Sequence, residues 1–245
     1  VYAYSYDQFD KAQTSGATCP VARDEAGGII YGANGDPRPM YYDYNGTKYA
    51  FTGGDAIYED VNHDGSIDQY DVVYLGSSLP KLTGGFGFRL FYKGWSLNAQ
   101  FNYRYGNKIA NVARMMAENM HGADNQSTAV NYRWRKEGDG ANGGHVLPRA
   151  LYGQGYNWMG SDRFVEDGSF LRLNYLQLSY GFDSKLVKRI GLSRLNLYVS
   201  GENLFCLTKY SGVDPEVNYG SMGVTKDEAI TPRAKSFTFG LTATF

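Results

Sequence analysis

Long segments that alternate between apolar and polar side chains constrain the fold of this chain more than any other feature. The clearest covers residues 236–245, where Phe237, Phe239 and Leu241 alternate with serine, threonine and glycine. A period of two predicts a β-strand with one apolar face and one polar face. The same pattern predicts strands at residues 84–92, 95–105, 170–182 and 194–204, with a bulge near Asn174 and Tyr175.

The length of these segments separates a membrane barrel from a soluble sandwich. Strands of soluble proteins usually have about five or six residues. Segments of about ten residues, at about 3.3 Å per residue and a tilt near 45°, match an apolar band about 25 Å tall. The polar faces carry arginine, glutamine and asparagine, which suit a water-filled lumen better than a packed core. The sequence therefore predicts an all-β fold, an antiparallel transmembrane β-barrel.

The connections between the predicted strands alternate in length. Residues 10–81, 106–168 and 207–233 form long connections, whereas residues 93–94 and 183–193 form short ones. Outer-membrane barrels have short periplasmic turns and long extracellular loops. We therefore expect the long connections to face outward, and a further strand, residues 1 to about 9, to lead into the first of them.

The composition of the chain excludes several other classes of protein. The net charge is -1, so no basic field is available for nucleic acid. No run of about eighteen apolar residues suggests a spanning helix, and no signal peptide is visible at the start. Cys19 and Cys206 are too few for a disulfide framework, and whether they pair is left open. We expect a segment of a longer polypeptide; whether Val1 follows a proteolytic cut is also open.

Several blocks of sequence, in order, resemble the SusC-like (SusC/RagA) branch of TonB-dependent outer-membrane transporters. The blocks are GDAIYEDVNHDGSID (residues 54–68), YLG (74–76), LPK (79–81), FVEDGSFLRLN (164–174), YVSGENLF (198–205) and TKYSGVDPE (208–216). The terminal strand that ends in Phe245 follows them.

The resemblance implies a barrel of about 22 strands in the outer membrane of a Gram-negative cell. Residues 1–245 would be its C-terminal part, with about six strands; the plug domain and the N-terminal strands would be absent. It also implies import of oligosaccharides or oligopeptides, a SusD-like lipoprotein lid, and a TonB complex that binds the absent N-terminal region. Which nutrient is carried, and the oligomeric state, are left open.

The terminal strand also looks like the signal that the barrel-assembly machinery reads. The residues that would carry this signal are Phe237, Phe239, Leu241 and Phe245. In the alternative interpretation Phe245 is simply the last residue that faces outer-membrane lipid.

Residues 60–71 match a calcium-binding loop nearly position for position. The candidate ligands are Asp60, Asn62, Asp64, Ser66 through its carbonyl, Asp68 and Asp71. Gly65 falls at the sharp turn and Ile67 at the usual apolar position. Asp71 replaces the usual bidentate glutamate, which predicts weak, structural Ca²⁺ binding. The alternative is an Asx-rich surface turn without an ion.

The second long connection contains four aromatic candidates for the substrate vestibule: Trp134, Tyr152, Tyr156 and Trp158. They could stack on sugar rings or peptide side chains, or they could pack within their own loop. A short helix is predicted at residues 109–121, with an apolar stripe. No catalytic motif is present, so an enzyme is not predicted. The alternative to a transporter is a calcium-stabilised extracellular β-sandwich that binds a ligand.

Overall fold

The computed structural model describes residues 2–4, 21–52, 54–136, 139, 147–216 and 225–245. The chain divides into two compact units. One comprises residues 1–76 and 110–166, and the other comprises residues 77–109 and 167–245.

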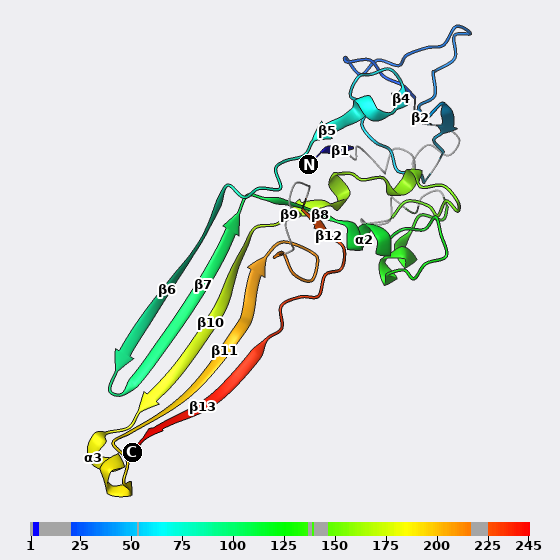
Figure 1. The fold of residues 1–245 in the computed structure, drawn as a ribbon. Helices are drawn as coiled ribbons and strands as arrows, with labels where there is room; N and C mark the ends of the chain where they lie inside the picture. Colours follow the sequence, from blue (N-terminus) through cyan, green and yellow to red (C-terminus); the bar gives the residue numbers. More distant parts are fainter. Residues whose placement is uncertain (1, 5–20, 53, 137–138, 140–146, 217–224) are drawn as a thin grey trace. The chain divides into compact units, whose positions relative to one another are not determined.

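The second unit is built on a sheet of five long antiparallel strands (Figure 1). Its strands are β6 (Leu82–Tyr92), β7 (Trp95–Tyr105), β10 (Phe170–Gly181), β11 (Arg194–Thr208) and β13 (Ser236–Thr244), in the order β13-β11-β10-β7-β6. All five predicted long strands are therefore confirmed. The prediction placed the end of β11 too early, because pairing with β10 continues to Thr208.

A β-bulge interrupts the centre of this sheet where the sequence predicted one. The register of β10 shifts between Leu173 and Tyr175 against both β7 and β11. Asn174 is the extra residue against β7, whereas against β11 it faces two residues, Asn203 and Leu204. The alternation of apolar side chains therefore changes phase there. The apolar residues on either side of the bulge consequently share one face.

That face of the sheet is apolar on every strand. The register places Phe88 opposite Ala99, Leu97 opposite Leu178, and Val199 opposite Phe239. The other face carries polar residues, among them Arg89, Asn98, Gln100, Gln177, Ser179, Asn196, Thr238 and Thr242. The sheet therefore has the two chemically different faces that the sequence pattern predicted.

The two short connections of this sheet have defined turn chemistry. Lys93 and Gly94 both have positive φ, 45° and 86°, which gives the tight hairpin between β6 and β7 its right-handed twist. Between β10 and β11 lie α3 (Ser184–Val187) and η5 (Lys188–Ile190), and Gly191 ends them with a φ of 81°. Asp183 caps α3 by accepting a hydrogen bond from the Lys185 N–H group.

The first unit contains short strands around a buried core. A three-stranded sheet has the order β3-β2-β4, with β2 at Tyr41–Tyr44, β3 at Thr47–Ala50 and β4 at Ser66–Ile67. The core of the first unit includes Ala22, Met40, Tyr42, Phe51, Ala56, Ile57, Tyr58 and Ile67. The turn η1 (Gln69–Asp71) leads into β5 (Val72–Tyr74), which pairs with β1 (Tyr2–Tyr4). The strand predicted at residues 1–9 is thus described only as β1; residue 1 and residues 5–9 lie outside the described part.

The remainder of the first unit is mostly helical turns. Its elements are α2 (Val112–Ala117), η2 (Thr128–Tyr132), η3 (Tyr156–Trp158) and η4 (Asp162–Phe164). The predicted helix at residues 109–121 is shorter than expected, because Ile109 belongs to β8 (Lys108–Asn111) and Asn111 caps the helix. The strands β9 (Val165–Asp167) and, in the second unit, β12 (Lys226–Asp227) complete the described elements. None of the helices described here has both the length and the apolar character needed to cross a membrane.

Candidate functional site

The predicted metal loop is held in shape by its own side chains. Asp60 Oδ2 accepts a hydrogen bond from the Gly65 N–H at 2.7 Å, and Asp60 Oδ1 accepts one from the Asp64 N–H at 3.2 Å. Asn62 Oδ1 accepts a further bond from the Asp64 N–H at 3.0 Å. Gly65 has a φ of 83°, and a Cβ there would lie 2.8 Å from the Ala22 Cβ. The loop therefore requires glycine at its sharp turn.

Asp71 closes the loop from a buried position. Its Oδ1 accepts a hydrogen bond from the Val61 N–H at 2.9 Å, and its Oδ2 accepts one from the Asp68 N–H at 2.8 Å. Burial raises the pKa of the Asp71 carboxyl, and the negative charges of Asp60 and Asp68 raise it further, against the effect of the two backbone hydrogen bonds. A bound cation would remove this unfavourable interaction between carboxylates.

The apolar side chain of Ile67 anchors the loop in the core of the first unit. Ser66 and Ile67 form β4, which pairs in parallel with β2, and Ile67 is fully buried in the core of the first unit. Among the residues described, no three histidine, cysteine, aspartate or glutamate side chains are gathered as a metal-binding group. The calcium site stays a prediction, and it would require the carboxylates to turn toward the ion.

The four aromatic vestibule candidates lie in different environments. The Trp158 side chain is only 3% exposed and belongs to a core cluster with Met120 and Phe164, whereas Tyr152 is 81% exposed. Tyr156 stacks on Tyr49 with ring centroids 4.6 Å apart. The Trp134 ring covers Gly54, whose Cβ position would be 2.3 Å from it. Packing within the unit therefore accounts for three of them, and only Tyr152 presents its ring to solvent.

A buried polar cluster that the sequence reasoning missed lies beneath the loops of the first unit. Arg149 Nε is 2.6 Å from Asp55 Oδ1, and the Asp55 carboxylate is completely buried. The Tyr49 hydroxyl donates to Asp55 Oδ2 at 3.0 Å, and Asn157 Nδ2 donates to Oδ1 at 3.0 Å. Burial raises the pKa of the Tyr49 hydroxyl, and the Asp55 charge adds to the rise. The cluster joins two chain segments about a hundred residues apart and has no local spacing signal.

A second ion-pair cluster in this unit fixes α2. Glu118 accepts from Arg114 Nε at 2.9 Å and from Arg163 Nη2 at 2.6 Å, and Arg114 Nη1 also lies 3.2 Å from Glu166 Oε1. Only the Arg114–Glu118 spacing of four residues could have been found from the sequence. These contacts position the loop.

A third cluster, in the second unit, ties the last long connection to the sheet. Arg172 of β10 is buried and pairs with Asp214 at 2.5 Å and with Glu216 at 3.2 Å. Arg233 pairs with the other oxygen of Glu216 at 2.8 Å. Asp214 and Glu216 belong to the TKYSGVDPE block, so part of that block has a structural role.

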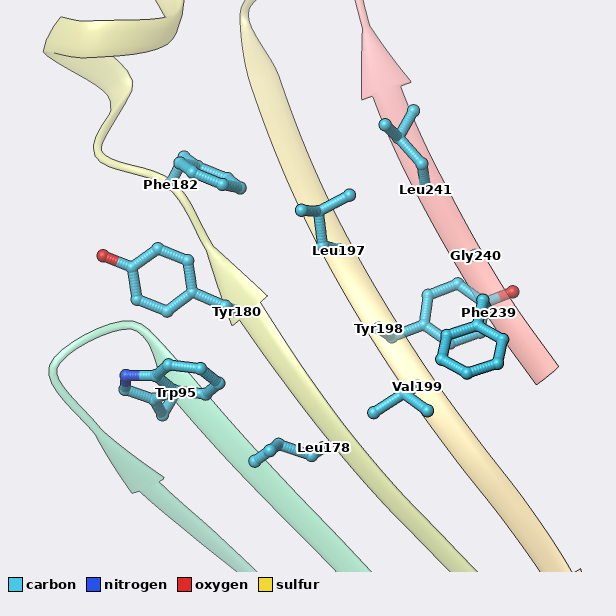
Figure 2. A pocket seen from close by; sticks show the side chains of 10 residues that line it. All are labelled: Trp95, Leu178, Tyr180, Phe182, Leu197, Tyr198, Val199, Phe239, Gly240 and Leu241. Carbon is cyan, nitrogen blue, oxygen red and sulfur yellow. The ribbon is translucent and has the colours of Figure 1, made fainter. Parts of the chain in front are cut away.

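The apolar face of the five-stranded sheet is exposed in the described chain. The four residues of the expected assembly signal all lie on it or at its end and are exposed: Phe237, Phe239, Leu241 and Phe245. Beside them the face is hollowed into a groove of about 750 Å³, lined by side chains of β7, β10, β11 and β13 (Figure 2). Such an area of exposed apolar surface marks a face that is covered by lipid or protein.

One of the two cysteines, Cys206, lies among the residues that the structure describes. Cys206, in β11, is partly buried and forms no disulfide with any residue that the structure describes. Cys19 lies outside the described residues, so pairing between the two stays open.

A five-stranded antiparallel sheet with one apolar and one polar face, joined by short turns at one end, matches the barrel fold of TonB-dependent transporters. The sequence comparisons indicate the branch of TonB-dependent receptors to which the chain is similar. The chain is 30% identical over 199 residues to the TonB-dependent receptor P3 of Formosa agariphila, covering 78% of this chain and 19% of that receptor. It is 29% identical over 213 residues to the TonB-dependent receptor SusC of Bacteroides thetaiotaomicron, covering 83% and 18%. This chain is therefore a homologue of SusC-like TonB-dependent receptors, as the sequence motifs indicated.

The solved structures agree with this assignment. The chain matches the RagAB peptide transporter with a TM-score of 0.65 and 25% identity, over 78% of this chain and 21% of that chain. It matches the RagAB peptide importer in the 'closed-closed' state over 100% of its length, with a TM-score of 0.66 and 22% identity, which shows the fold alone. No family model matches. The chain spans about a fifth of the length of the relatives it matches, which fits a C-terminal segment of a longer receptor.

Proposed function

We propose that this chain forms part of the barrel wall and of the outer loops of a TonB-dependent transporter in the outer membrane. The observation that carries the proposal is the sheet, whose strands of nine to fifteen residues keep one apolar face across their pairing. Strands of this length and alternation suit the apolar band of a bilayer. The relatives named above are receptors and importers, which supports the same class.

The transported substrate in this proposal is an oligomeric nutrient, an oligosaccharide or an oligopeptide. A SusD-like surface lipoprotein would close over the barrel, and a TonB complex would supply the energy through a part of the receptor outside this chain. Support comes from the homology to SusC and from the similarity to the RagAB peptide transporter. The exposed ring of Tyr152 is the candidate in this chain for direct contact with such a substrate.

The proposal is tested in the source organism by deleting the full receptor gene. Uptake and growth are then measured on defined oligopeptides and oligosaccharides, with the matching free amino acids and monosaccharides as controls. We expect a loss on one oligomer class, no loss on the monomers, and rescue by the intact gene. Normal uptake of every oligomer by the deletion strain would contradict the proposal.

We also propose that residues 60–71 bind Ca²⁺ and that the ion stiffens an outer loop. The supporting observations are the N–H groups that already orient Asp60 and Asp71, and the burial and neighbouring carboxylates that raise the pKa of Asp71. With aspartate in place of glutamate at the closing position, the expected dissociation constant is about 10⁻⁴ to 10⁻³ M.

Terbium luminescence provides a direct test of the ion site. Tyr70 is exposed and adjacent to Asp71, so it can sensitise a bound Tb³⁺ ion. The purified full receptor should show emission that Ca²⁺ displaces, and Asp60→Asn should lose it. Asp43→Asn, a change of the same charge outside the loop, is the control. Equal emission from both variants would contradict the proposed site.

The terminal strand is proposed to carry the signal for the barrel-assembly machinery. The side chains that would carry this signal are exposed, so the machinery could bind them before the strand pairs with another strand. They are Phe237, Phe239, Leu241 and Phe245. Replacing Phe245 with serine should lower the amount of folded receptor in the outer membrane, measured by heat-modifiable migration. An unchanged amount would favour the simpler interpretation, in which Phe245 only faces lipid.

A further inference from the structure

The short turns of the five-stranded sheet lie at one end of it, and a cluster of exposed cations lies at this end. The turn between β10 and β11 and the first residue of β11 contribute Lys185, Lys188, Arg189 and Arg194, and the hairpin between β6 and β7 contributes Lys93. We call these five residues the basic turn cluster. All five are exposed, and within the described part of the chain none has an ion pair with a carboxylate.

Backbone pairing brings the cations together at one end of the sheet. Gly181 donates its N–H to the Gly94 carbonyl at 2.8 Å, so the two turns are neighbours. Arg194 pairs with Thr244 in the register of β11 and β13. Figure 1 shows α3, in yellow, next to the end of β13. Asp183 is the one carboxylate of this turn, so the five cations give a local excess of positive charge.

The same turn exposes apolar side chains beside its cations. Leu186 is 58% exposed and Ile190 is 68% exposed, whereas Val187 between them is buried. Two exposed apolar side chains next to several lysines and arginines are typical of a segment that lies in a membrane interface. In water this arrangement would leave the apolar area without cover.

The apolar groove of Figure 2 begins at the same end of the sheet. Trp95 follows Gly94 directly, and its ring centroid lies 4.8 Å from that of Tyr180. Phe182 lies 5.0 Å from Tyr180, and Leu197 and Leu241 continue the groove along the strands (Figure 2). Its volume of about 750 Å³ is within the usual range of small-molecule sites. Cations at one end and an apolar groove beside them match the two parts of a phospholipid.

We propose that this end of the barrel binds an anionic phospholipid. The basic turn cluster holds the phosphate headgroup, and an acyl chain lies in the groove between Trp95, Tyr180 and Leu197. An anionic headgroup is favoured over a zwitterionic one, because a zwitterion brings its own positive charge to a cationic site. Each cation near an anionic membrane surface strengthens binding by about fivefold. The inference rests on the proposed function, since it requires the sheet to be in a bilayer.

The experiment uses the full receptor in nanodiscs that contain equal amounts of phosphatidylcholine and phosphatidylglycerol. The receptor is then extracted in mild detergent, and the lipids that remain bound are quantified by mass spectrometry. We expect the wild type to retain phosphatidylglycerol preferentially. The variant K185Q/K188Q/R189Q/R194Q should lose this preference by about tenfold or more. Leu178→Trp, which fills the groove without changing the charge, should also lower retention.

A matched variant separates this site from general charge effects. K48Q/K136Q/K226Q/K235Q removes the same charge: Lys48 and Lys136 belong to the first unit, while Lys226 and Lys235 precede β13 at its other end. It should retain phosphatidylglycerol like the wild type. Equal losses in the two quadruple variants, or a wild type without preference, would overturn the lipid site. A receptor that inserts as a heat-modifiable barrel but shows no preference sinks only this inference, whereas one that fails to insert sinks the proposed function as well.

Discussion

Arg149 Nε lies 2.6 Å from Asp55 Oδ1 across 94 residues of sequence, and the carboxylate it contacts is fully buried. This pair connects the segment before β6 with the segment between β7 and β10. Both segments belong to loops that we expect to face outward. A buried carboxylate with an arginine, a tyrosine and an asparagine as partners is a strong constraint on the shape of such loops.

Removing the charge of Asp55 should therefore loosen the whole first unit. Asp55→Asn leaves Arg149 without its partner, and breaking a buried pair costs about 3 kcal/mol of unfolding free energy. The first unit should become sensitive to limited proteolysis while the barrel stays intact. Asp43→Asn, which breaks the exposed contact with Lys48 at 3.9 Å, should cost less than about 1 kcal/mol. Equal protease sensitivity of the two variants would contradict this role.

The pH dependence of calcium binding should report on Asp71. Its pKa is raised by burial and by neighbouring carboxylates, so the folded loop binds this proton more tightly than the unfolded chain does. Without a bound ion, protonation of Asp71 at lower pH removes the free-energy cost of a buried charge. The folded loop therefore becomes more stable as the pH falls. With Ca²⁺ the proton competes for the carboxylate, so the affinity should fall as the pH falls toward the raised pKa of Asp71. Calorimetry on wild type and Asp71→Asn checks this; a wild-type affinity independent of pH would count against it.

The two faces of the sheet should differ sharply in their tolerance of charge. Phe88→Arg places a cation on the apolar face near the middle of β6, which costs about 2 to 4 kcal/mol in a bilayer. Gln100→Arg places the same charge on the polar face of the adjacent strand, opposite Gly87. The amount of heat-modifiable receptor in the outer membrane should fall for the first variant only. A similar fall for both would mean that the faces are assigned incorrectly.

The pair Tyr198 and Gly240 should behave as a coupled unit. A Cβ at Gly240 would lie 2.1 Å from the Tyr198 ring, which covers this glycine across β11 and β13. Gly240→Ala should displace the ring and cost about 1 kcal/mol. In a Tyr198→Ala background the same change should cost almost nothing. Thermal unfolding of the four proteins measures the coupling, and additive effects would argue that the ring contact is not stabilising.

The strands could be predicted from the sequence because their signal is local. In each strand, apolar and polar side chains alternate with a period of two over the length of the strand. A two-residue turn, Lys93–Gly94, joins β6 to β7. Even the bulge at Asn174 was visible as a change of phase. The calcium-like loop was visible for the same reason, because its candidate ligands fall within twelve consecutive positions.

The interior of the loops could not be predicted, because its contacts join residues that are distant in sequence. Nothing near Asp55 indicates Arg149 as its partner, and nothing near Arg172 indicates Asp214. Trp158 and Tyr152 look alike in the sequence, yet one is in a core and the other faces solvent. Helical propensity at residues 109–121 extended the helix over Ile109, which pairing in β8 places in a strand.

Site-specific labelling can show whether the apolar face of the sheet contacts lipid and the polar face contacts water. Single cysteines at Phe88, Leu178 and Phe239, and at Asn98, Gln177 and Thr238, are labelled with a fluorophore in the full receptor in nanodiscs, with the native Cys19 and Cys206 replaced. We expect a quencher carried by lipid to act on the first three positions and a water-soluble quencher to act on the second three. Quenching of both sets by the water-soluble reagent alone would contradict the barrel and favour a soluble binding module.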